Sequence, residues 1–399
     1  MRLNRSEIQK MMEDYKCTDT LSWSKFNMYT SDLFSFYLKY IKNIREERKN
    51  SYALLGSVVH DNLEKFYKNI YTREQMIDNF DAEMAKQSLS DVQFVANEEQ
   101  NSKIENRYYN CIKHFFYNYQ KASDYSKLEQ FVCMKFGKYL MQGYIDHMYP
   151  KIIEKTDMSG ISSTHQVVVI EDFKTSTIYT GPKIEKNSGQ LKLYAFMIHN
   201  MYNIPFDKIQ IGWNFLKYVT LTYHLKNGNI KSTNISRDEL AQSLGAKIKT
   251  WSNFYKYSAD EYNQFMDIIY KNSEKYMDNN ILDGLPQEIQ EKFKIEDCFV
   301  EIPYSEDIAN EFIKYVSDTI EEMDSKINIY NTTLDSNVFW QDVTDENSFY
   351  FTNLCGYTSK YHLPLRKYLE DKGVFEGKTE KKTNNLDSDI FDMLFANLS

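Results

Sequence analysis

An acidic and a basic side chain stand two residues apart at the end of the most strand-like segment of the sequence. In VVVIEDFKTS (167–176), four β-branched apolar residues come before Asp172 and Lys174. Side chains two apart on a strand point to the same face, and a buried strand would deliver this pair to its own end. A lone pair of this kind is usually an ion pair on a solvated face, so the surrounding motifs decide whether it does chemistry.

A second carboxylate, Asp146, stands at the end of GYIDHM, where apolar and polar residues alternate as in a strand that could lie beside the first. Two carboxylates and an ammonium group would supply oxygen ligands for Mg²⁺ or Mn²⁺ and a lysine to hold a water or a phosphate oxygen. His147 and Glu171 adjoin the two acids and would face the other side of their strands. We expect both to be structural.

Two further motifs have the spacing of helix faces. GSVVHDNLEKFY places His60 one turn before Glu64, and GQLKLYAF places Gln190 one turn before Tyr194. Each pair alone is as typical of an ordinary surface or a satisfied core group as of a site. They indicate a site only in combination with the two acidic motifs, because of the order in which all four motifs occur along the chain.

The residue spacing predicts a mixed α/β fold around these motifs. The clearest helical stripe, with Leu55, Val59 and Leu63, lies in 54–71. The other predicted helices are 102–121, 188–202, 236–280 and 305–330, and the predicted strands lie in 131–150, joined at Gly137–Lys138, in 167–176, and in 209–233, with a turn at Asn227–Gly228. The polar stretch 154–166 is typical of a surface loop. This alternation favours one mixed sheet with helices packed on it.

Composition excludes several classes of protein. With 13 Gly and 6 Pro in 399 residues, collagen-like and low-complexity chains are ruled out. The net charge of −9, from 48 basic and 57 acidic residues, argues against a protein that coats nucleic acid through a general electrostatic field. No stretch approaches the ~18 apolar residues of a membrane span, so we expect a cytoplasmic protein. Five scattered cysteines without a CxxC pair indicate neither a disulfide framework nor a zinc ribbon.

In this order, the motifs resemble the RecB-like branch of the PD-(D/E)xK nuclease superfamily, which includes the nuclease domains of bacterial helicase–nucleases and CRISPR-associated RecB-like exonucleases. The resemblance begins at LSWSKFNMYTSDLFSFYLKYI, which is similar to the S-x-S-(K/R) helix that opens these domains. It runs to IGWNFLKY, so it covers roughly residues 21–220. It implies a restriction-endonuclease-like central mixed sheet flanked by helices, with helical additions at both ends.

The resemblance also implies roles for single residues. His60, Asp146, Asp172 and the backbone carbonyl of Phe173 are implied as ligands of one or two Mg²⁺ or Mn²⁺ ions. Lys174 is implied as the catalytic lysine that orients or activates the attacking water, beside the two acids.

Further residues are implied to support this centre or to touch nucleic acid. Gln190 and Tyr194 match the family's Q-x-x-x-Y motif, and Glu64 is grouped with them. Cations after the opening helix could grip phosphates, although a solvated helix face also explains them: Lys39, Lys42, Arg45, Arg48 and Lys49.

The sequence departs from relatives that hold an iron–sulfur cluster with one early and three late cysteines. The early position falls near Asp32, and the late group falls in NLCGYTSKYHLP, where Cys355 is followed by Thr358 and a position near Pro364. One thiolate cannot hold the cluster, so we expect none. Ordinary packing of the aromatic residues in 349–361 would then hold the C-terminal region against the core.

We expect four regions: a helical region carrying the His motif (1–125), the nuclease core (126–235), a helical region packing on the core (236–380), and a tail (381–399). Within the tail, DSDIFDMLF (387–395) resembles acidic–hydrophobic peptides that bind sliding clamps and, loosely, the tail of single-strand-binding proteins. A final amphipathic helix packing on the core is the alternative. The residues of the expected partner peptide are Asp389, Ile390, Phe391, Leu394 and Phe395.

The resemblance implies a metal-dependent DNA exonuclease that acts at DNA ends in replication, recombination or repair, on DNA with a free or single-stranded end. A structure-selective endonuclease on flaps or forks and a catalytically silent DNA- or protein-binding scaffold are the alternatives. The chain has no G-x-x-x-x-G-K-(S/T) phosphate loop, so a motor would lie elsewhere. Its richness in Lys, Asn, Ile and Tyr suggests an AT-rich genome such as that of a bacteriophage, which would place the protein in the host cytoplasm.

Overall fold

The computed structural model describes residues 3–374, except residues 50, 91, 96–97, 157–161 and 275–276. Its centre is a seven-stranded sheet in the order β1-β3-β4-β5-β6, with β2 paired to β3 and β7 paired to β5. The strands are β1 (Asp19–Ser22), β2 (Lys127–Phe136), β3 (Tyr139–Thr156), β4 (Ser162–Lys174), β5 (Ile209–His224), β6 (Ile230–Ser236) and β7 (Phe293–Ile302). The pairs β1–β3 and β4–β5 are parallel and the others antiparallel. The predicted mixed sheet is therefore confirmed.

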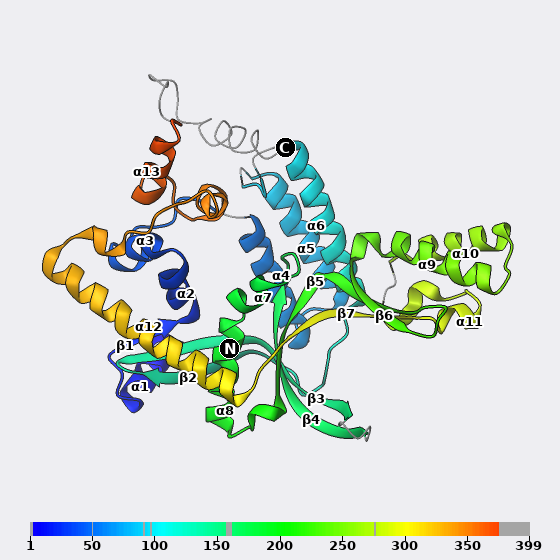
Figure 1. The fold of residues 1–399 in the computed structure, drawn as a ribbon, viewed down its shortest axis with the longest axis horizontal. Coiled ribbons are helices and arrows are strands. Elements are labelled where there is room, and N and C mark those ends of the chain that lie inside the picture. Colours follow the sequence, from blue (N-terminus) through cyan, green and yellow to red (C-terminus); the bar gives the residue numbers. More distant parts are fainter. Residues whose placement is uncertain are drawn as a thin grey trace.

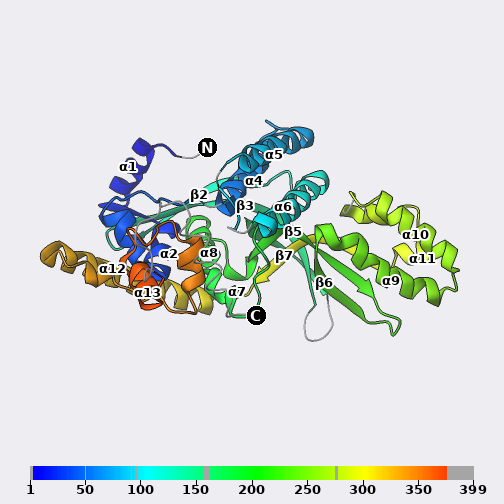
Figure 2. The same ribbon diagram turned by 90° about the horizontal axis from the view of Figure 1, so that it is seen from above.

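Helices cover both faces of this sheet (Figures 1 and 2). On one face lie α4 (Ser51–Tyr67), α5 (Arg73–Ser88) and α6 (Glu98–Asn118), whose apolar residues form one cluster with Phe173 and Leu216 of the sheet. On the other face lies α8 (Gly189–Tyr202), which packs on Ile170 and Ile211. The helical periodicity seen in the sequence at α4, α6 and α8 is confirmed, because their apolar stripes face the sheet.

The two ends of the described chain pack together beside the sheet. The N-terminal helices are α1 (Arg5–Asp14), α2 (Trp23–Ser31) and α3 (Leu33–Phe36), followed by the π-helical turn η1 (Tyr37–Ile41). α2, α3 and η1 meet α12 (Glu306–Thr333), the turn η5 (Ser336–Phe339), the π-helical turn η6 (Tyr350–Leu354) and α13 (Leu363–Asp371) (Figure 1), whereas α1 packs near Cys133 and Leu140 of β2 and β3. Rings of Tyr37 and Phe339 stack at 5.3 Å, and the Tyr29 hydroxyl donates to Glu322 at 3.0 Å. Segments about 300 residues apart thus share one core.

A third apolar cluster lies at the far end of the molecule. It is formed by the outer parts of β5, β6 and β7 with α9 (Leu240–Phe254), α10 (Ala259–Lys271) and α11 (Gln287–Gln290) (Figures 1 and 2). The connecting short elements are α7 (Pro182–Asn187), η2 (Phe206–Lys208), η3 (Arg237–Glu239) and η4 (Met277–Leu282). None of the helices in the described part of the chain is long and apolar enough to cross a bilayer.

The described parts of the stretch 154–166 are strand and not the loop that their polarity suggests. β3 continues to Thr156 and β4 begins at Ser162, with Glu154 paired to Thr164. These ends of the two strands are solvated, and even Ile152 is 72 % exposed. The polar composition of these paired strand ends therefore reflects their lack of apolar cover, and the sequence cannot distinguish such ends from a loop.

Close packing of β5 on β7 gives a test of the sheet. A Cβ on Gly212 would lie 2.4 Å from the Phe299 ring and 2.7 Å from the backbone oxygen of Val300. Because backbone cannot move aside cheaply, we predict that Gly212→Ala lowers the free energy of unfolding by about 1–3 kcal/mol. Urea unfolding measures this, with Gly56→Ala as control, since a Cβ there meets its nearest atom at an ordinary 3.5 Å. Equal stability of the two variants would contradict the described packing.

Candidate active site

The pairing of β3 with β4 brings the two predicted acids together. His147 of β3 lies opposite Glu171 of β4, so the preceding Asp146 and the following Asp172 lie beside each other on the opposite face of the two strands. A hydrogen bond joins their carboxyl groups. Asp172 is near the end of β4, as expected, but Asp146 is not at a strand end, because β3 runs on to Thr156.

His60 reaches this pair from α4. Its Nδ1 is 3.4 Å from Asp146 Oδ2, and its Nε2 is 3.0 Å from the carbonyl oxygen of Phe173. The backbone N–H of Phe173 donates to the same Asp146 oxygen at 3.2 Å. Val59 and Leu63 are fully buried on either side of His60, so packing of α4 fixes the position of the imidazole.

Lys174 completes the group. Its Nζ is 2.5 Å from Asp172 Oδ2, and its side chain remains 27 % exposed. Like Asp172, it projects to the face covered by α8, as their spacing on the strand requires. The ammonium group therefore stands between the acids and solvent, where it can reach a substrate oxygen.

Gln190 and Tyr194 also face the acids, from the first turns of α8. The Gln190 amide donates to the Tyr194 hydroxyl at 3.3 Å, and both line a narrow cleft with Asp146 and Asp172. Tyr194 packs directly against Gly143, where a Cβ would lie 2.2 Å from its hydroxyl. A glycine at this point of β3 lets the tyrosine approach the strand closely.

Electrostatics tie the four ionisable groups together. Burial opposes ionisation of Asp146, but His60, the hydrogen bond from Asp172 and the Lys174 ammonium outweigh it, so its pKa lies below the ordinary value. Burial and the charge of Asp146 raise the pKa of Asp172, despite the opposing effect of Lys174. Burial lowers the pKa of His60, yet the charge and hydrogen bond of Asp146 outweigh it, and the net shift is upward.

These residues fit a divalent cation. His60 contacts both Asp146 and the Phe173 carbonyl, and Asp172 lies beside Asp146 on the same face of the strands. Carboxylates, a backbone carbonyl and an imidazole are donor types that Mg²⁺ and Mn²⁺ accept. The two buried acids are compensated by neighbouring groups, because Lys174 contacts Asp172 and His60 contacts Asp146. A cation would take over that compensation, so His60, Asp146, Asp172 and the Phe173 carbonyl are the residues that would hold it.

His147 and Glu171 form a separate buried pair on the other face. His147 Nδ1 is 2.8 Å from Glu171 Oε2, its Nε2 is 3.0 Å from the Ser126 hydroxyl, and its ring stacks on Phe173 at 5.4 Å. The pair thus packs against Phe173, the residue whose carbonyl oxygen contacts His60. This placement matches the structural role expected for both residues.

The other predicted residues have contacts of their own or are exposed, and one of them, Arg48, lines the same cavity as Lys174. Glu64 is ion-paired with Lys68, and Lys39 with Glu46 at 2.7 Å. Arg48 donates to the Thr352 carbonyl at 2.6 Å and lines a cavity of about 740 Å³ with His60 and Lys174. Lys42, Arg45 and Lys49 are exposed. The residues of the expected partner peptide lie outside the described residues.

A second polar cluster, the Asp32–Cys355–His362 clasp, joins the two ends of the chain. These three buried residues bring their ligand-type atoms within 4.8 Å of one another. Asp32 and Cys355 are at the positions that the sequence comparison marked, but His362 stands where a residue near Pro364 was expected. The C-terminal region is therefore held by buried polar contacts as well as by aromatic packing, a feature that the sequence prediction missed. A histidine two residues before Pro364 was its only signal.

Hydrogen bonds show how the clasp is protonated. Nδ1 of His362 accepts from the backbone N–H of Leu365 at 3.1 Å, so its Nε2 carries the proton and donates to Asp32 Oδ1 at 3.1 Å. Cys355 Sγ is 3.5 Å from Asp32 Oδ2, and burial raises the pKa of this thiol to about 12. A metal ion on Nε2 would force the proton onto Nδ1, facing the Leu365 donor. This arrangement favours a hydrogen-bonded clasp over a metal site.

The active-site geometry predicts that metal binding releases protons. Mn²⁺ competes with the protons on His60 and on the Asp146–Asp172 pair, so its affinity should rise as pH rises from 6 to 8. Isothermal titration calorimetry in Tris and in Hepes measures both affinity and proton release. His60→Gln should bind more weakly and release fewer protons, whereas affinity independent of pH would contradict the assigned ligands.

For the Asp32–Cys355–His362 clasp we predict a contribution to stability and no bound metal. His362→Leu removes the donor to Asp32 and should lower the free energy of unfolding by about 1–3 kcal/mol, because a buried carboxylate loses its partner. His362→Gln, whose amide can both donate and accept, is the matched control and should lose less. Mass spectrometry of the dialysed protein should find no stoichiometric iron or zinc. Bound metal that is lost in Cys355→Ala would contradict this view.

Comparisons with known proteins agree with this geometry. The family description for the PD-(D/E)XK nuclease superfamily matches residues 20–329, a segment that contains strands β2 to β7, most of β1, and the residues around Asp146 and Asp172. A comparison with curated protein sequences gives no match. The matched segment is well over half of the sequence and carries the acids, the lysine and the histidine of the site. The chain therefore belongs to the PD-(D/E)XK nuclease superfamily.

Proposed function

We propose that this nuclease is a Mg²⁺- or Mn²⁺-dependent deoxyribonuclease of the RecB-like branch that digests DNA from its ends. Superfamily membership supports a nuclease. The observation that carries the proposal further is the contact of Lys174 with an acid pair that fits a divalent cation. Phosphodiester hydrolysis needs a positioned water, a neutralised phosphate oxygen and a stabilised leaving group.

Each side chain has a distinct task in this proposal. Asp146, Asp172 and His60 hold the cation, which supplies charge stabilisation to the scissile phosphate. Lys174, still partly exposed beside Asp172, orients the attacking water or holds a phosphate oxygen. Gln190 and Tyr194 fix the wall of the cleft behind the acids. These positions leave the substrate to enter through the cavity at Lys174.

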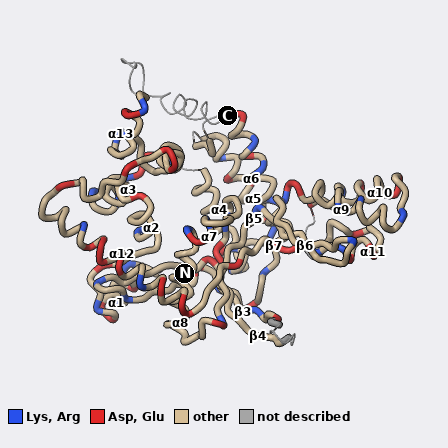
Figure 3. The backbone as a smooth tube through the Cα atoms, in the orientation of Figure 1, with Lys and Arg blue, Asp and Glu red and all other residues tan. Residues whose placement is uncertain are grey.

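That cavity supports a single-stranded end as substrate. Its walls include His60 and Lys174 on one side and residues 93–95 and 352–354 on others. A volume of about 740 Å³ suits one or two nucleotides, which favours entry of a strand end over binding along a duplex. Acidic and basic residues are interspersed along most elements (Figure 3), so substrate would be gripped locally at this site.

Two biological proposals go with this function. Action during replication, recombination or repair in a cytoplasm, with a bacteriophage as source, follows from the RecB-like resemblance and the composition. Contact with a sliding clamp or a single-strand-binding protein would use the tail beyond residue 380.

Substitution of Lys174 tests the proposed chemistry. Lys174→Ala should lower turnover of end-labelled linear single-stranded DNA by about 100- to 1000-fold while sparing DNA binding, because only a transition-state contact is lost. Lys271→Ala, exposed at the end of the distant α10, is the control and should match the wild type. EDTA should abolish the activity. Unchanged turnover of Lys174→Ala would contradict the assigned site.

Closed circular single-stranded DNA separates the exonuclease from the endonuclease. An enzyme that needs an end should leave the circle intact while degrading its linear form, whereas cleavage of the circle would favour the endonuclease alternative. Absence of turnover on both forms, with binding intact, would favour the silent scaffold.

A further inference from the structure

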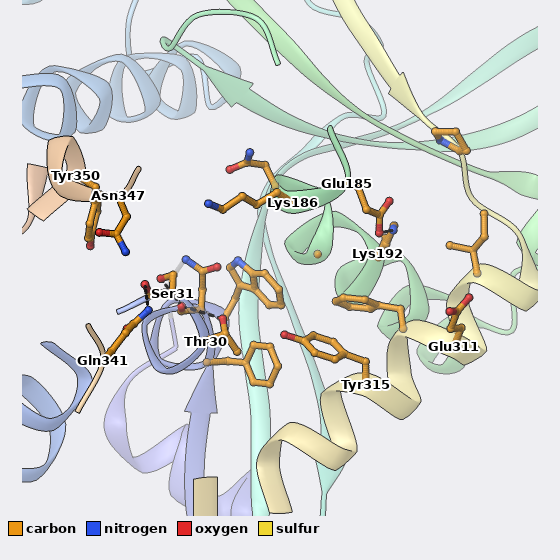
Figure 4. A pocket seen from close by; sticks show the side chains of 18 of the residues that line it. Thr30, Ser31, Glu185, Lys186, Lys192, Glu311, Tyr315, Gln341, Asn347 and Tyr350 are labelled. Carbon is orange, nitrogen blue, oxygen red and sulfur yellow. Dashed lines mark hydrogen bonds and ion pairs between the residues drawn. The ribbon is translucent and has the colours of Figure 1, made fainter. Parts of the chain in front are cut away.

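A second and larger cavity adjoins the catalytic one. It measures about 1120 Å³ and lies between α2, the α7–α8 segment, α12 and residues 341–351. Figure 4 shows Asn347 and Tyr350 on one side of this space and Lys186 on the opposite side, with Tyr315 of α12 along its floor. We call it the lateral groove. Its lining is rich in aromatic rings and amide groups.

The first turn of α8 links the lateral groove to the catalytic centre. Gly189 and Lys192 of this helix line the groove, whereas Gln190 and Tyr194 face the two acids. The same helix therefore borders the lateral groove on one side and the two acids on another.

The segment 347–354 forms the other boundary between the two cavities. Phe349, Thr352 and Leu354 line the catalytic cavity, and Asn347 and Tyr350 line the lateral groove. The two neighbouring rings in this segment are unusually open for aromatic side chains: Phe349 is 49 % exposed and Tyr350 is 37 % exposed. Across the groove, Tyr315 is 46 % exposed. Open rings on both sides provide faces on which flat groups can stack.

Charges in the groove argue against a site for phosphates alone. Lys186 is exposed, but Lys192 is ion-paired with Glu185 at 2.5 Å, and Glu311 also lines the groove. The two lysines and two glutamates among the lining residues leave no net positive charge. A ligand held here is therefore recognised mainly by stacking and by hydrogen bonds to amides. Unpaired bases offer both, whereas a duplex hides the faces of its bases.

We propose that the lateral groove binds the unpaired bases of a single strand whose end lies in the catalytic cavity. The strand crosses the Phe349–Tyr350 boundary, and its bases stack on Tyr350 and Tyr315. This inference rests on the proposed function and adds a substrate-binding surface to it. It makes the enzyme selective for single strands that extend several nucleotides beyond the cleaved bond.

Binding measured apart from cleavage tests the groove. In a Lys174→Ala background with EDTA, fluorescence anisotropy compares a 5-mer and a 20-mer of oligothymidylate. Tyr315→Ala with Tyr350→Ala should weaken binding of the 20-mer by tenfold or more and change that of the 5-mer less. Tyr350→Phe keeps the ring but loses the hydroxyl that lies 3.4 Å from Asp32, so it should bind like the parent. Tyr270→Ala, 56 % exposed on the distant α10, is the matched surface control.

The outcomes separate this inference from the proposed function. Two results would contradict binding of unpaired bases in the lateral groove, even if the wild type is a nuclease. One is an unchanged affinity of the double variant for the 20-mer, and the other is an equal loss of affinity for a 20-base-pair duplex. A wild type that binds the 20-mer through these tyrosines but hydrolyses no DNA would overturn the proposed function and support the groove. Circular dichroism of each variant establishes that it is folded before its binding is compared.

Discussion

The antiparallel pairing of β3 and β4 places two carboxyl groups side by side in a buried position, and the surrounding structure compensates for that contact. Two adjacent acids repel each other when both are ionised, and burial strengthens the repulsion. Lys174 meets Asp172 and His60 meets Asp146. The elements that carry these two side chains, β4 and α4, are therefore fixed relative to β3 by charge as well as by packing. A divalent cation between the acids would satisfy the same constraint.

Sequence patterns predicted the elements whose signal is local. The apolar run before Asp172 marked β4, and the spacing of Val59 and Leu63 marked α4. The sequence could not show that β1 and β7 join the same sheet, because strand pairing at separations of 70 to 120 residues depends on tertiary contacts. It also could not show that His60 bridges the Phe173 carbonyl and Asp146. The resemblance supplied these residues as a set, and the structure supplies their contacts.

The packing of the N-terminal helices against the C-terminal segment could not be predicted from the sequence for a similar reason. The likeness to cluster-holding relatives drew attention to Asp32, where a cysteine is missing, and to Cys355, where one is kept. The polar clasp also depends on His362, which is 330 residues from Asp32. No local periodicity reports such a contact. The clasp matters for function because η6 and the residues before it bound both the catalytic cavity and the lateral groove. Anchoring the C-terminal segment on α3 thus shapes the path that substrate would take.

Anomalous diffraction from crystals soaked in Mn²⁺ is the most direct test of the central claim that the paired acids form a metal centre. The account predicts a peak within coordination distance of Asp146, Asp172 and the Phe173 carbonyl, and its loss in Asp172→Asn. Absence of density there in crystals soaked at saturating Mn²⁺, or a peak confined to Asp32, Cys355 and His362, would contradict it.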